Sequence, residues 1–180
     1  MTTVAVAPRE IHDLVYRCCR VAGCDPGLAD RVADNVMYAE VLIGGGVAAF
    51  VATAGADEPT SAFAQAADRV ESAEAGLRSG GDGRAEFDEP VPLAAIAGAI
   101  WHLLGRPMSC TPAFSSDASA LCAAVEIVDG KAEEAQLQPL RDRVAGCMRN
   151  GVAVPTAAFE VLEVRATAFL VAEATLDELA

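Results

Sequence analysis

The feature that most constrains the fold is a helix, a capped break and a second helix within residues 10–46. Apolar residues recur at offsets of three and four in the first segment, at Ile11, Leu14, Val15, Cys18, Cys19 and Ala22. Such spacing places one apolar stripe on a helix. Gly23 ends this helix, Asp25 offers an N-cap oxygen, and Pro26 takes the first helical position, where its missing N–H costs nothing. The second segment repeats the stripe at Leu28, Val32, Val36 and Ala39, and the glycine run 44–46 ends it or permits close packing.

The remaining pattern predicts a mostly helical α+β fold, a single compact domain of Ala-rich helices over residues 1–180 with a small sheet possible. Residues 1–8 are expected to be a loose lead-in, and the glycine-rich stretch near 78–90 a possible exposed loop. We expect helices near 10–23, 26–43, 61–77, 92–104, 131–149 and 155–167. Short strands are possible near 47–53, 121–128 and 168–172, although the first two segments also fit helices.

Composition limits the class of partner. The chain carries a formal charge of −13, which argues against nucleic acid and against an anionic membrane surface, since both require clustered Lys and Arg. Hydrophobic residues make up 53% but aromatic residues only 5%, so much apolar surface comes from small side chains and favours burial in a homo-oligomer or a hetero-complex with another protein. No secretory signal or membrane helix is expected, which indicates a cytoplasmic protein with reduced cysteines.

Three cysteines near the first break suggest a thiol chemistry. Cys18, Cys19 and Cys24 lie close together in sequence, and thiolates of this kind bind zinc. The spacing lacks the second Cys-x-x-Cys pair of a structural zinc site, and neighbouring cysteines on a helix point about 100° apart. Burial in the core is the alternative interpretation, because cysteine is among the most buried residue types.

The candidate catalytic residues are His102, Cys110 and Asp117, which bring polar groups to the end of an apolar helix and the segment after it. His102 can instead be a core or interface histidine, and His12 is expected to be exposed.

The acidic pairs, such as Asp30 and Asp34, are expected on solvated helix faces. Neither glycine-rich stretch has the strand and helix that frame a phosphate loop, so we expect no cofactor.

The two ends of the chain resemble those of a bacterial domain family of unknown function. Members open with an "aRGaGlxxGlAEeaa" run, similar to residues 19–30, and end with a helix, similar to residues 158–174. Val21 replaces a usual glycine, and Ala172-Glu173 replaces a Pro-Ala-Ser segment. This resemblance implies no reaction.

The N-terminal helices more distantly resemble those of the malate/L-lactate dehydrogenase family. The similar residues are Ala22-Gly23, Ala29, Val32-Ala33, Ala39-Glu40 and the Gly44–Val47 run. Gly45 stands where that family has a histidine, and the chain has about half the required length, so the resemblance implies a helical scaffold and not hydride transfer.

These observations leave three functional hypotheses. The first is a non-catalytic interaction or assembly protein, an accessory subunit of a cytoplasmic complex, because a catalytic constellation is missing while small apolar surface is abundant. The second is a small enzyme, or an enzyme subunit whose site a partner chain completes, with His102, Cys110 and Asp117 as its residues. The third is metal binding by Cys18, Cys19 and Cys24.

Overall fold

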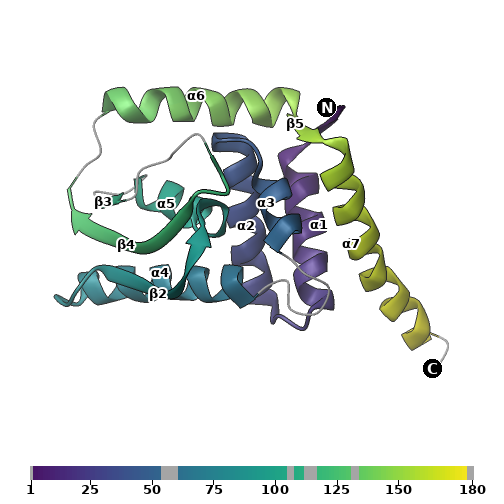
Figure 1. The fold of residues 1–180 in the computed structure, drawn as a ribbon, viewed down its shortest axis with the longest axis horizontal. Helices are drawn as coiled ribbons and strands as arrows, with labels where there is room; N and C mark the ends of the chain where they lie inside the picture. The colour runs from purple at the N-terminus through teal and green to yellow at the C-terminus, as the bar shows by residue number, and fades with distance from the viewer. Residues whose placement is uncertain (1, 54–60, 105–107, 112–116, 131–133, 178–180) are drawn as a thin grey trace.

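The computed structural model describes residues 2–53, 61–104, 108–111, 117–130 and 134–177, which form a mostly helical α+β fold (Figure 1). The helices are α1 (Pro8–Val21), α2 (Pro26–Leu42), α3 (Gly46–Thr53), α4 (Ser61–Arg78), α5 (Ala97–Leu104), α6 (Glu134–Asn150) and α7 (Thr156–Asp177), with a 3-10 turn η1 (Leu93–Ala95). The strands are β1 (Thr3–Val6), β2 (Arg84–Pro92), β3 (Met108–Thr111), β4 (Leu121–Asp129) and β5 (Val152–Pro155). The predicted fold class is confirmed.

Both sheets are antiparallel. One has three strands in the order β2-β4-β3, and β4 confirms the strand expected near 121–128. The other pairs β1 with β5, with Thr3 opposite Pro155 and Val6 opposite Val152. Residues 3–6 are therefore not a loose lead-in, because a distant segment of the chain supplies their ladder of hydrogen bonds.

The predicted break between α1 and α2 is confirmed in detail. Gly23 has φ +89°, and its N–H donates to Arg20 O at 3.1 Å while Cys24 N–H donates to Cys19 O at 3.0 Å. This pair of bonds is the Schellman motif, which suits a glycine because the left-handed conformation costs it little. Asp25 Oδ1 then accepts from Leu28 N–H at 3.0 Å and so caps the start of α2.

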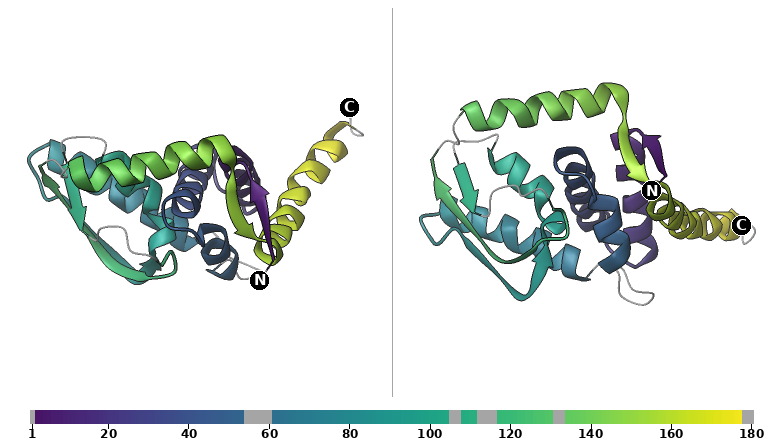
Figure 2. Two further views of the ribbon diagram at one scale, coloured as in Figure 1. Left: turned by 90° about the horizontal axis from the view of Figure 1, so that it is seen from above. Right: turned by 45° about the horizontal axis from the view of Figure 1, so that its top comes forward.

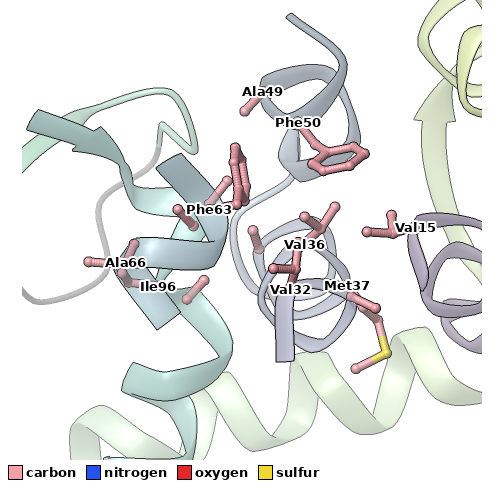
Figure 3. Packing of buried hydrophobic residues seen from close by; sticks show 14 of the residues in the cluster. Val15, Val32, Val36, Met37, Ala49, Phe50, Phe63, Ala66 and Ile96 are labelled. Atoms are coloured by element: carbon pink, nitrogen blue, oxygen red, sulfur yellow. The ribbon is translucent and has the colours of Figure 1, made fainter. Parts of the chain in front are cut away.

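Helix α2 lies at the centre of the molecule, with α1 and α7 on one side and α4, α5 and the three-stranded sheet on the other (Figure 1). Its buried side chains meet those of α1, α3 and α4 in one core, in which Phe50 and Phe63 pack edge to face with ring centroids 5.3 Å apart (Figure 3). Each such side chain contributes about 1.5–3 kcal/mol through burial, so this cluster holds the helices around α2.

Two of the expected strands are helices. Residues 47–53 lie in α3, and residues 168–172 lie inside α7, which continues to Asp177. A short apolar run fits a buried strand and a buried helix equally well. The long stretch of Ala, Leu and Glu that surrounds residues 168–172 favours a helix. For residues 47–53, hydrogen bonds from Gly45 N–H and Val47 N–H to the Glu40 carboxylate on α2 favour the helix.

The segment 92–104 is not one helix. Leu93 N–H donates to Ala120 O at 2.8 Å and Ala94 N–H to Ala118 O at 2.9 Å, so the chain before β4 supplies acceptors for the start of η1. Ile96 N–H donates to Leu93 O at 3.1 Å and closes this 3-10 turn before α5 begins at Ala97. The segment 78–90 is a loop only in part, because pairing with β4 makes a strand from Arg84 onward. Helix α6 begins at Glu134 and continues through Pro139; residues 131–133 lie outside the described part.

Candidate functional site

Both histidines of the chain face the same carboxylate, that of Asp34. His102, near the end of α5, places Nε2 3.2 Å from Asp34 Oδ2. His12, in the second turn of α1, places Nε2 3.8 Å from Asp34 Oδ1 and 3.4 Å from Asp30 Oδ1. Residues 90 positions apart therefore meet at one aspartate on the central helix, and three helices are joined by this His–Asp–His arrangement.

Helical spacing on α2 accounts for the local geometry. Asp30, Asp34 and Tyr38 are four residues apart, so their side chains lie along one face. The rings of Tyr38 and His102 pack edge to face with centroids 5.3 Å apart. Burial and the neighbouring Asp34 carboxylate raise the pKa of Tyr38 above its ordinary value.

A cleft of about 290 Å³ opens beside Asp34 and His102, between α2, α4 and α5. Its lining combines apolar residues, such as Val70 and Leu103, with the charged side chains of Arg31, Glu71 and Glu74. Arg31 Nη2 contacts Asp68 Oδ1 at 2.5 Å, and Arg31 Nε lies 3.4 Å from Glu71 Oε2. The cleft is thus rich in carboxylates, each with a basic side chain close by.

The backbones of α5 and α2 approach each other closely on one side of this cleft. Asn35 is buried and its Oδ1 accepts from Ala99 N–H at 3.0 Å, which satisfies a donor in the first turn of α5. A Cβ at Gly98 would lie 3.0 Å from Asn35 N and from the Asp34 carbonyl group, so a larger residue would push the backbones of α5 and α2 apart. These contacts hold α5, which carries His102, against the turn of α2 that carries Asp34.

The structure leaves the three predicted catalytic residues in different situations. His102 is about half exposed and belongs to the arrangement around Asp34. Cys110 lies in β3 opposite Ile127, and its side chain is outside the described part of the chain. Asp117 is exposed and accepts from Ser119 N–H at 2.9 Å and from its hydroxyl at 2.6 Å, and these bonds lower the pKa of Asp117. The recorded geometry does not assemble the three into one centre.

The three cysteines proposed as metal ligands lie around the end of α1. Cys18 and Cys19 are buried, and Cys24 is half-buried in the turn that follows. Cys18 Sγ donates to Leu162 O at 3.6 Å, and burial raises the pKa of Cys18 to about 11 and that of Cys19 further still. Metals bind thiolates, and burial opposes their formation. Among the described residues, no three His, Cys, Asp or Glu side chains are placed to hold one metal ion.

Sequence reasoning missed His12 and Asp34 as members of this arrangement. The His12 side chain is only 21% exposed, in contrast to the expected exposed position, and Asp34 faces α1 and α5 as well as solvent. The sequence offers one signal for this arrangement. Asp30 and Asp34 are four residues apart on one predicted helix, so their carboxylates lie on the same face and can meet histidines from neighbouring helices.

A second feature of interest is the length of α7. Helices α1 and α7 run side by side in the same direction, and Cys18 on α1 meets Leu162 on α7 (Figure 1). Beyond that contact α1 ends at Val21, whereas α7 continues to Asp177. The difference of 12 residues corresponds to about 18 Å of helix. Figure 2 shows this end of α7 projecting from the body of the molecule.

The sequence of the projecting part of α7 is mostly apolar. Ala166 is the last residue of α7 recorded as buried; we name residues 167–177 the α7 overhang. The sequence of the overhang contains two acidic residues and no basic one. Val164, one turn before it, is 74% exposed. Val161, three residues before Val164, is 38% exposed, so both valines contribute to an exposed apolar face of α7.

The chain matches no family model, no curated protein and no solved structure. The resemblances to a bacterial domain family and to the malate/L-lactate dehydrogenase family therefore remain expectations from sequence. Within the described residues, no helix has both the length and the apolar character needed to cross a membrane.

Proposed function

We propose that this protein is a non-catalytic interaction or assembly protein, an accessory subunit of a cytoplasmic complex, which binds another protein chain through α7. The observation that carries this proposal is the outer face of α7, where Val161 is 38% and Val164 is 74% exposed on a helix that projects from the body of the molecule. Exposed apolar surface of this kind marks interaction sites in proteins. Cytoplasmic location is part of the proposal, supported by five described cysteines that remain free thiols.

The exposed valine beside the overhang provides the test. Val164→Asp places a charge on the outer face of α7 without altering the buried side, where Leu162 and Ala166 lie. Val128→Asp is the matched control, because Val128 is also an exposed valine but lies on β4. Light scattering at micromolar concentration should give a mass above the 18.5 kDa of one chain for the unaltered protein and the control, and a smaller mass for Val164→Asp. A clean monomer that copurifies with no partner contradicts the proposal.

A second candidate function rests on His102 and Asp34. A carboxylate that orients an imidazole beside a cleft is the arrangement of a general base, and here the two groups are 3.2 Å apart at the edge of a 290 Å³ cleft. The protein is then an enzyme, or a subunit whose site a partner completes. Substitution His102→Ala should abolish the ligand-induced rise in melting temperature, or the activity, while leaving the melting temperature of the free protein unchanged. An activity that persists in His102→Ala excludes this role.

A further inference from the structure

We propose that the turn between α1 and α2 is a site of thiol–disulfide exchange, at which Cys19 and Cys24 form a disulfide when a small-molecule disulfide oxidises them. Both residues are free thiols in the structure. In cytoplasmic proteins, disulfides that form are usually transient and redox-sensing. The inference goes beyond the proposed interaction function and does not depend on it.

The backbone of the turn brings these two cysteines together. Cys24 N–H donates to Cys19 O at 3.0 Å and so closes the Schellman motif that ends α1. The residues at the two ends of such a motif frequently pack their side chains together, and here both are cysteines. Because one hydrogen bond joins the two backbones, covalent geometry keeps their Cα atoms within about 7 Å, the limit for a disulfide without backbone movement.

The side chains are neighbours as well. Burial raises the pKa of Cys19, and the Cys24 thiol raises it further through its charge and its side-chain contact. Cys18 is directed elsewhere, because its Sγ donates to Leu162 O on α7. Adjacent residues on a helix point about 100° apart, so Cys19 and not Cys18 is the partner of Cys24.

The two thiols differ in their access to solvent, which sets the order of the reaction. Cys24 is half-buried between the exposed residues Gly23 and Asp25, whereas Cys19 is 0% exposed. The thiolate is the nucleophile in exchange, and burial disfavours the thiolate of Cys19. Cys24 is therefore the residue that meets the oxidant, and Cys19 is the residue that completes the bond.

The exchange takes place in two steps. Cys24 Sγ, as the thiolate, attacks one sulfur of the small disulfide, whose S–S bond breaks; one half stays on Cys24 and the other leaves as a thiolate that takes up a proton. Cys19 Sγ then attacks Cys24 Sγ, gives its proton to the departing thiolate and displaces the second half. Two protein thiols are oxidised, and one small disulfide is reduced to two thiols.

A tryptic digest tests the pairing in the full chain. The folded protein is incubated with oxidised glutathione, its remaining thiols are blocked with N-ethylmaleimide, and it is digested without reduction. Cleavage after Arg17, Arg20 and Arg31 separates the two cysteines into peptides 18–20 and 21–31. Mass spectrometry should find these peptides joined, with the loss of two hydrogens and without glutathione.

Substitutions identify the partner of Cys24. Cys18→Ala, which alters the other buried cysteine of the same peptide, is the matched control and should keep the link. Cys19→Ala should lose the link and retain glutathione on Cys24, so the ratio of linked to glutathione-bearing peptide should fall at least about tenfold. Cys24→Ser changes a half-buried position and should also lose the link, which provides a second test if Cys19→Ala does not fold.

A half-buried cysteine outside the turn shows what exchange gives without a partner thiol. The recorded contact of Cys147 is with Val41 O, so Cys147 should keep any glutathione that it acquires. The proposal is overturned by glutathione that stays on Cys24 of the unaltered protein, by a Cys24 that is neither linked nor modified, or by a link that survives in Cys19→Ala.

Discussion

Glu40 Oε2 accepts a hydrogen bond of 2.8 Å from Val47 N–H, in the turn that joins α2 to α3. Its other oxygen accepts from Gly45 N–H at 3.2 Å. Glu40 is only 1% exposed, so its carboxylate takes the place of water for the first N–H groups of α3. The negative charge also lies at the positive end of that helix. This contact explains why residues 46–53 form a helix where a strand was equally compatible with their apolar character.

Glu40→Ala should lower the free energy of unfolding by about 2–4 kcal/mol, because buried N–H groups lose a charged acceptor. Glu40→Gln keeps one oxygen acceptor and should cost about 1–2 kcal/mol. Urea denaturation of the three proteins, followed by circular dichroism, measures both differences. Equal stability of Glu40→Ala and the unaltered protein contradicts the capping role.

Gly46→Ala should destabilise the protein by about 2–3 kcal/mol, because a Cβ there forces overpacking. The added carbon would lie 2.5 Å from Val36 O and 2.6 Å from Glu40 N, both of them backbone atoms. Gly146→Ala on α6 is the control: a Cβ there meets nothing within 4 Å, so the helix should gain about 0.5–1 kcal/mol. Thermal unfolding should therefore shift the two melting temperatures in opposite directions. A Gly46→Ala protein as stable as the Gly146→Ala protein is inconsistent with the close packing of α2 and α3.

Local signals explain the part of the fold that the sequence predicts. Gly23, Asp25 and Pro26 act through their own backbone or through bonds to neighbours a few residues away, so their effects are visible in a short window. The helical stripes of α1 and α2 are local in the same sense, and the structure confirms both helices.

The features that the sequence does not predict depend on distant partners. β1 is a strand because β5 pairs with it, and four residues alone carry too little signal. His12 and His102 acquire their position only when α1 and α5 pack against α2. The buried Glu40 resembles any other glutamate until the glycine run after α2 turns the chain back over it. Tertiary packing therefore determines the candidate site, while local signals determine most of the helices.

The shared carboxylate predicts a specific pattern in the histidine signals. Asp34→Ala should shift the imidazole ¹H–¹³C resonances of both His12 and His102, because both rings lie within 3.8 Å of that carboxylate. Asp30→Ala is the matched control on the same face of α2; it should shift the His12 signals alone, since the recorded contact of Asp30 is with His12. A spectrum of Asp34→Ala in which only one histidine moves shows that the two rings do not share Asp34 in solution.

The buried thiol of Cys18 predicts a loss of stability in alkaline solution. Burial raises the pKa of Cys18 from its ordinary 9.0 to about 11, so the folded protein keeps this proton over a range in which the unfolded chain loses it. The resulting stabilisation is complete below pH 9 and disappears as the pH rises towards 11. It amounts to about 2–3 kcal/mol. In urea denaturation at a series of pH values, Cys18→Ala should lose less stability between pH 9 and 11 than the unaltered protein. Parallel curves for the two proteins would show that the Cys18 thiol is not buried at the contact of α1 with α7. They would therefore contradict the packing of Cys18 against Leu162.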